Sequence, residues 1–155
     1  MNTNANALSV VRSLTSIILV TIQFLCLFFL IYTGTVYNLG NYAFLLELTS
    51  ILLGSWAVYA MRTSKLNIFP ELRPGSSLIR KGPYRIIRHP MYLAVILFAI
   101  SMLLNYFTLF RLLIVSVLAI DLVIKIEYEE TLLDKELPGY IEYRSKTYKL
   151  IPYIY

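Results

Sequence analysis

Two long stretches of apolar residues constrain the fold of this chain more than any other feature. The first runs from about Leu14 to Tyr32 without a charged residue, and the second, from about Tyr42 to Met61, contains only Glu47. A helix needs about 20 mostly apolar residues to cross a hydrocarbon core about 30 Å thick. Both stretches are therefore predicted to be transmembrane helices.

A third apolar region, from Met91 to about Ile126, is interrupted at Asn105. It divides into a short span and a longer one that begins near Thr108, which is typical of a tight helical hairpin. The 155 residues are 58% hydrophobic and 15% charged, which is the composition of a membrane protein rather than of a soluble domain. We therefore predict a single all-α domain, an integral membrane helical bundle of about four transmembrane helices followed by a C-terminal helix outside the membrane.

The basic residues indicate how this bundle is oriented. Seven of the 14 Lys and Arg residues lie between Arg62 and Arg88 and five lie from Lys125 onward, whereas the connections at 34–41 and 105–107 carry none. By the positive-inside rule, both termini are expected in the cytoplasm. Topology thus accounts for the net charge of +5, and nucleic acid is not an expected partner. The predicted order is two helices at 10–61, a cytosolic loop at 62–90, the hairpin at 91–126 and a cytosolic segment at 127–155.

Two polar clusters, residues 82–92 and residues 125–130, flank the hairpin. Because a hairpin returns to the membrane face that it left, the clusters are predicted to be neighbours there. One offers cations, an imidazole and phenols, and the other offers carboxylates, a combination that suits a zwitterionic ligand. The alternative is that these residues are only the basic flank and interfacial aromatics common to membrane helices. With one histidine, His89, and one cysteine, Cys26, neither a metal site nor a disulfide is expected.

Several short motifs follow one another in the second half of the chain. They are Gly82-Pro83-Tyr84, Arg88-His89-Pro90-x-Tyr92, Lys125 four residues before Glu129-Glu130, Tyr140-x-x-Tyr143 and Lys149-Leu150-Ile151-Pro152. In this order they resemble the isoprenylcysteine carboxyl methyltransferase family, from roughly Leu66 to the C-terminus. The resemblance implies an enzyme that takes a methyl group from S-adenosyl-L-methionine on the cytosolic side of the membrane.

The resemblance also implies roles for individual residues. Lys125 falls at the family's substrate-side arginine, and Lys125 and Arg88 are the residues expected to act in catalysis, with Arg88 or His89 holding the carboxylate end of the cofactor. The chain departs from the family at Lys125, at Ala94 in place of a glycine, and at 76–79 in place of a histidine. The positions that correspond to cofactor contacts are Ser76, Leu78, Ile79, Tyr84, His89, Pro90, Met91, Tyr92, Glu129 and, by likeness to the related phospholipid methyltransferases, Glu130.

The acceptor implied by the resemblance is the carboxylate of a lipophilic, prenylated substrate that reaches the site from the lipid bilayer. A phospholipid amine is an alternative acceptor, which would need a base to remove its proton. A small four-helix transporter is a separate hypothesis, because Glu47 and Asp121 are carboxylates inside predicted spans. A structural subunit or an inactive relative is the remaining alternative. The sequence does not indicate an oligomeric state.

Overall fold

The computed structural model describes residues 3–34, 42–62 and 78–153, with the side chains of the first stretch described from residue 13 onward. This part of the chain is helical, with an isolated bridge between Ile87 and Tyr148 as its only β-pairing. The predicted all-α bundle is confirmed. Its elements are α1 (Thr3–Thr33), α2 (Tyr42–Met61), the 3-10 helix η1 (Gly82–Arg85), α3 (Pro90–Asn105), α4 (Leu109–Glu136) and α5 (Tyr140–Ser145).

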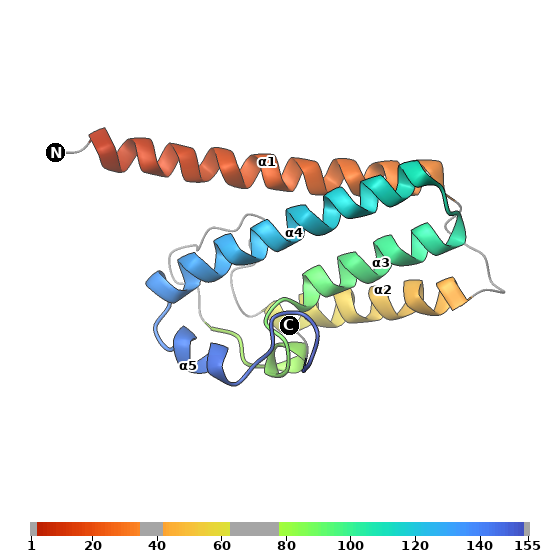
Figure 1. Cartoon of the computed structure of the whole chain (residues 1–155). Coiled ribbons are helices and arrows are strands. Elements are labelled where there is room, and N and C mark those ends of the chain that lie inside the picture. Colours follow the sequence, from red (N-terminus) through yellow and green to blue (C-terminus); the bar gives the residue numbers. More distant parts are fainter. Residues whose placement is uncertain (1–2, 35–41, 63–77, 154–155) are drawn as a thin grey trace.

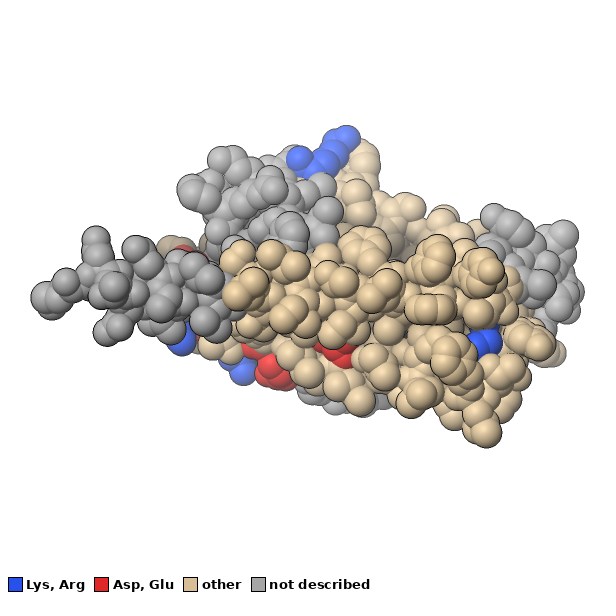
Figure 2. All heavy atoms as spheres, turned by 90° about the horizontal axis from the view of Figure 1, so that it is seen from above, with Lys and Arg blue, Asp and Glu red and all other residues tan. Residues whose placement is uncertain are grey.

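Two of these helices are long and apolar enough to cross a membrane, over Ser13–Thr33 of α1 and over the whole of α2. They coincide with the two predicted spans. The third, α3, is a shorter apolar helix of 16 residues, which corresponds to about 24 Å at 1.5 Å per residue. The face seen in Figure 2 is largely uncharged over the described residues, with few acidic and basic side chains in view. Such a surface suits lipid better than water.

The last two long helices form the expected hairpin. Thr108 ends the short connection after α3 and caps α4, because its side-chain oxygen accepts a hydrogen bond from the backbone N–H of Arg111. Figure 1 shows α4 running back beside α1, while α2 packs along α3. The apolar part of α4 continues without a break into its polar end at Glu136, after which α5 turns back towards the bundle.

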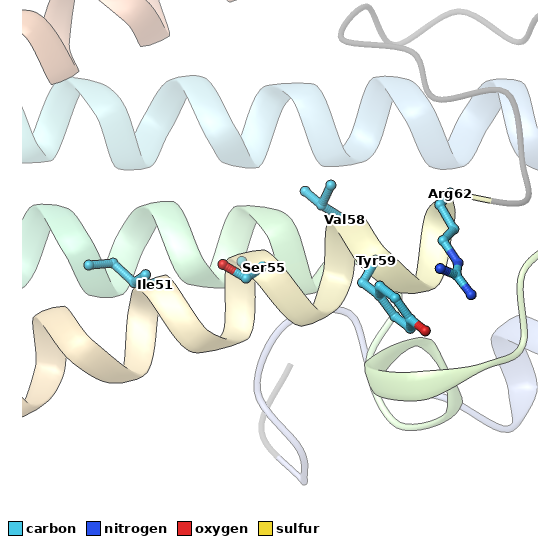
Figure 3. Close-up of a pocket in the computed structure, with 6 residues that line it drawn as sticks. Ile51, Ser55, Val58, Tyr59 and Arg62 are labelled. Atoms are coloured by element: carbon cyan, nitrogen blue, oxygen red, sulfur yellow. The ribbon is translucent and has the colours of Figure 1, made fainter.

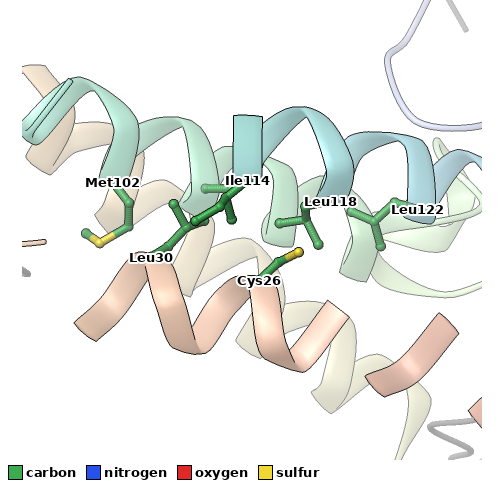
Figure 4. Close-up of a cluster of buried hydrophobic side chains, with 7 residues drawn as sticks. Cys26, Leu30, Met102, Ile114, Leu118 and Leu122 are labelled. Carbon is green, nitrogen blue, oxygen red and sulfur yellow. The ribbon is translucent and has the colours of Figure 1, made fainter. Parts of the chain in front are cut away.

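The hydrophobic core lies where α1, α3 and α4 meet, as Figure 4 shows. On α4 the buried residues Ile114, Leu118 and Leu122 recur every four positions, which places them on one face of the helix. The single cysteine is buried among them and packs as a small hydrophobic residue, as expected for its position in the span. The other members of the core are Cys26, Leu30, Ala99 and Met102.

A buried arginine closes the core at the end where α3 passes into α4. Arg111 is 1% exposed, and its Nη1 donates to the carbonyl oxygen of Leu30 at 3.1 Å and to Oγ1 of Thr33 at 2.8 Å. Its Nη2 donates to the carbonyl oxygen of Met102 at 2.6 Å. A Cβ atom on Gly34 would lie 2.6 Å from Nη2, so only glycine leaves room for the guanidinium. Arg111 thus fastens the last turns of α1 and α3 to the first turn of α4.

Candidate active site

The start of α3 is held by the C-terminal segment. His89 is the N-cap residue and Pro90 occupies the first helical position, where its missing N–H costs no hydrogen bond. The backbone N–H of Arg88 donates to the carbonyl of Tyr148 at 2.8 Å, and that of His89 to the carbonyl of Lys149 at 3.1 Å. The imidazole makes no capping bond. It is therefore available to the carboxylates of α4.

Glu129 and Glu130 present their carboxylates to different neighbours because successive residues point about 100° apart around a helix. Glu130 Oε1 accepts a hydrogen bond from Arg88 Nε at 2.7 Å and lies 3.3 Å from His89 Nε2. Glu129 accepts a hydrogen bond from the hydroxyl of Tyr92, and its Oε2 lies 3.5 Å from His89 Nδ1. The imidazole thus stands between the two carboxylates, and its ring stacks on that of Tyr92 at 5.6 Å.

The charges of this cluster shift the pKa values of its members. Burial alone would raise the pKa of Glu130, but hydrogen bonds from His89 and Arg88 outweigh it and lower that pKa to about 2. Burial alone would lower the pKa of His89, but Glu129 and Glu130 outweigh it and raise that pKa above the usual value. Glu130 is therefore ionised at neutral pH, and the two carboxylates favour the protonated form of His89.

A polar stripe on α4, made of Asp121, Lys125 and Glu129, leads from this cluster into the bundle, because residues four apart lie on one helix face. Lys125 is 2% exposed, and its Nζ donates to Oε1 of Gln23 on α1 at 2.5 Å. The same Nζ lies 5.2 Å from the centre of the Tyr92 ring. Sequence reasoning missed Gln23, since it is an uncharged residue of the first predicted span and lies before the motifs.

Arg88 was expected to act in catalysis and to meet the cofactor's carboxylate. Its side chain is 6% exposed, with Nε bound to Glu130. Its Nη1 donates to the carbonyl oxygen of Arg144 at 3.1 Å and to that of Thr147. With these donors engaged inside the protein, the geometry favours a positioning residue that holds Glu130 and the C-terminal segment together.

The remaining predicted contacts differ in how far they are buried. Tyr84 in η1 is 6% exposed, and its carbonyl oxygen accepts a hydrogen bond from the hydroxyl of Tyr143 at 2.6 Å. Burial, followed by the nearby Tyr143 and Glu129, raises the pKa of Tyr84 far above its usual value. Ser76 lies outside the described residues. Pro90 is buried, and the half-buried side chains are those of Leu78, Ile79 and Met91.

A groove on the outer face of α2 is separate from these residues. Figure 3 shows Ile51, Ser55, Val58, Tyr59 and Arg62 along it. Its lining is mainly apolar, and none of the predicted site residues belongs to it. The groove therefore contributes nothing to the assignment of the site.

Comparison with known proteins agrees with the motifs. The sequence model of the isoprenylcysteine carboxyl methyltransferase (ICMT) family matches residues 43–135, which is more than half of the chain. The matched region includes α3, the polar cluster and nearly all of α2 and α4, whereas Gln23 lies before it. A comparison with curated proteins finds no match.

Proposed function

The chain belongs to the isoprenylcysteine carboxyl methyltransferase family, and on this premise we propose that it transfers a methyl group from S-adenosylmethionine to the carboxylate of a prenylated acceptor. The family and the helical fold support an integral membrane methyltransferase. The observation that carries the finer proposal is the contact of His89 and Tyr92 with Glu129 across the mouth of the hairpin. We assign this mouth to the cytoplasmic side, where a water-soluble cofactor is available.

The polar groups of the cluster suit this cofactor, which when bound supplies a methyl group on a cationic sulfur. Its ammonium, hydroxyl and amine groups donate hydrogen bonds, and the carboxylate of Glu129, 19% exposed, accepts such bonds. Glu130 Oε2 lies 3.8 Å from Arg144 Nε and 4.0 Å from Lys149 Nζ, so cations of the C-terminal segment already neutralise this oxygen. Glu129 is therefore the carboxylate that the cluster offers to the cofactor.

Each residue then has a distinct task. Glu129 binds a donor group of the cofactor, and Tyr92 orients that carboxylate through its hydroxyl. His89 and Arg88 are positioning residues, because they contact the glutamates and fix the start of α3 against α4. Lys125 supplies the cation for the acceptor's carboxylate from inside the bundle. Lysine keeps the charge of the family's arginine but not its bidentate geometry.

A carboxylate acceptor fits the protonation states of the site. It is ionised at pH 7, and as the new C–O bond forms and the methyl–sulfur bond breaks, no proton has to be removed. An amine acceptor would need a base. Glu130, with a pKa of about 2, and Tyr84, with a pKa raised far above its usual value, are poor bases at neutral pH. These values favour a carboxylate over a phospholipid amine.

Calorimetric binding of S-adenosylhomocysteine to the detergent-solubilised chain tests the proposal. The native protein is expected to bind, and Glu129→Gln to bind at least about tenfold more weakly, because a charge-assisted hydrogen bond contributes roughly 1.5–3 kcal/mol. Glu142→Gln is the matched control, since Glu142 is an exposed carboxylate whose partner is Lys146.

Either of two results would contradict the proposal. One is a folded native protein that binds no S-adenosylhomocysteine, and the other is a Glu129→Gln variant that binds as the native chain does. The first would redirect attention to the carboxylates inside the bundle and to transport, since Glu47 and Asp121 are 2% and 3% exposed.

A further inference from the structure

The groove on the outer face of α2 combines an apolar length with a cationic end. Ile51, Ser55 and Val58 lie along it, and Tyr59 and Arg62 lie together at the C-terminal end of the helix, as Figure 3 shows. Ile51 is 53% exposed and Val58 44%, so the other described helices do not cover this surface. Because α2 is long and apolar enough to span a membrane, the groove faces lipid, and the proposed methyl transfer makes no use of it.

The length of the groove matches one leaflet of a bilayer. Ile51 and Arg62 are 62 − 51 = 11 positions apart, which corresponds to about 16 Å along a helix axis. Half of a hydrocarbon core about 30 Å thick is about 15 Å. The small residues Gly54 and Ser55 lie between the bulkier side chains of the lining and leave space for a chain of methylene groups. The groove therefore has the depth and the lining that an acyl chain of one leaflet needs.

The cationic end of the groove can meet an anion. The guanidinium carbon of Arg62 lies 4.0 Å from the centre of the Tyr59 ring, and this ring is the partner that the described residues give to the side chain. An arginine stacked in this way keeps its N–H donors, which suit the paired oxygens of a phosphate. The lining contains no carboxylate, and Glu47, the one acidic residue of α2, is 2% exposed inside the bundle. Among the described residues, the end of the groove thus carries a positive charge that no carboxylate of the lining offsets.

We propose that this groove binds one anionic phospholipid, with an acyl chain along its apolar length and the phosphate on Arg62. The positive-inside rule assigns Arg62 to the cytoplasmic face of the membrane. The leaflet on that side carries a negative surface potential because of its anionic lipids. A zwitterionic phospholipid brings a cationic group beside its phosphate, which the guanidinium disfavours. The site is distinct from the cluster around His89, so it does not rest on the proposed function.

Native mass spectrometry of the detergent-solubilised full chain tests this site. Titrations with dioleoylphosphatidylglycerol and dioleoylphosphatidylcholine, which differ in the head group alone, give the dissociation constant of the first lipid bound. The native chain is expected to bind the anionic lipid about fivefold or more tightly, the effect of one arginine at a membrane surface. In Arg62→Gln this preference should fall below about twofold. In Ser55→Phe, at an exposed position where the ring fills the groove, the anionic lipid should bind about fivefold more weakly.

Arg85→Gln and Ser116→Phe are the matched controls. Arg85 is an exposed arginine of η1 and Ser116 an exposed serine of α4, and neither lines the groove. Both variants should bind the anionic lipid as the native chain does. Equal binding of the two lipids by the native chain would overturn the inference, as would native binding of the anionic lipid by Arg62→Gln or Ser55→Phe, or an equal loss in Arg85→Gln. Displacement of the anionic lipid by S-farnesylcysteine would also overturn it, because the groove would then be an entrance for the acceptor.

Discussion

Arg88 and Arg111 are both buried, at opposite ends of the bundle, and the two ends accommodate a guanidinium in different ways. Arg88 pairs with Glu130 in a cluster that also holds an imidazole and a second carboxylate. Arg111 binds two carbonyl oxygens and a hydroxyl, without an ion pair among the described residues. The first arrangement depends on ionised partners, whereas the second uses acceptors that any helix end provides.

This difference indicates which end of the bundle contributes to stability alone. Carbonyl oxygens at helix ends are left over by the helix itself, so Arg111 satisfies them without adding a group that titrates. The cluster around Arg88 gathers several titratable groups in one place, which stabilises the fold only while each charge has its partner. Titratable clusters of this kind are common at functional sites.

The largest effect should come from removing the carboxylate that Arg88 and His89 share. Glu130→Leu leaves the Arg88 guanidinium buried without its carboxylate and leaves His89 with Glu129 alone, and breaking a buried ion pair from one side costs about 3–5 kcal/mol. The free energy of unfolding, measured by denaturant titration in mixed micelles, should fall by this amount. Glu142→Ala, at an exposed pair, should leave it nearly unchanged. Equal effects of the two substitutions would mean that the cluster is not a stabilising unit.

Acid should weaken the Arg88 end selectively. The pKa of Glu130 is about 2 in the folded chain against 4.5 without its partners, so its contribution is present above pH 4.5 and is lost as the pH falls towards 2. The difference between these two pKa values corresponds to about 3 kcal/mol of folding free energy. Unfolding free energies of the native chain and Glu130→Gln, measured between pH 6 and 3, should therefore converge as the pH falls. If the difference between the two unfolding free energies stayed constant over this pH range, the low pKa of Glu130 would be contradicted.

The pKa of His89, the single histidine, gives a spectroscopic test of the charge pairing at the Arg88 end. Because the pKa of His89 is raised, its charged imidazole stabilises the fold at pH values below the pKa that His89 has in the unfolded chain. This contribution is lost as the pH rises through the pKa that His89 has in the folded chain. NMR titration of the imidazole should find a lower pKa in Glu130→Gln than in the native chain.

A smaller loss of unfolding free energy is expected at the Arg111 end of the bundle. Arg111→Leu removes the donors from the carbonyl oxygens of Leu30 and Met102, and unsatisfied buried acceptors cost about 1–3 kcal/mol in total once the apolar side chain fills part of the space. The loss should be the same at pH 6 and pH 4, because no carboxylate pairs with Arg111 in the described residues. Binding of S-adenosylhomocysteine should stay at its native value. A pH-dependent loss would show that the two ends do not differ as described.

The sequence was sufficient to predict the helices and the meeting of the two polar clusters. Two uncharged stretches of membrane length predict α1 and α2, and the break at Asn105 predicts the hairpin. The hairpin in turn implies that residues 82–92 and 125–130 meet, as His89 and Glu130 do. These predictions depend on length and on topology, which apolar patterning encodes directly.

The partners of the buried cations could not be predicted in this way. Gln23 and Lys125 are 102 residues apart, and a lone glutamine in an apolar span has no pattern that identifies its partner. Arg88 and Arg111 bind backbone carbonyl oxygens, which every residue carries, so no side-chain motif marks the acceptor. Ion-pair geometry depends on how helices are rotated about their axes, and this rotation is settled only by packing.

The pairing of Ile87 with Tyr148 also limits where the chain can be shortened. The backbone N–H groups of Arg88 and His89 donate to the carbonyl oxygens of Tyr148 and Lys149, and the backbone N–H of Tyr148 donates to the carbonyl oxygen of Ile86. A chain cut after residue 147 would lose all three of these hydrogen bonds, although the four long helices would keep their full length.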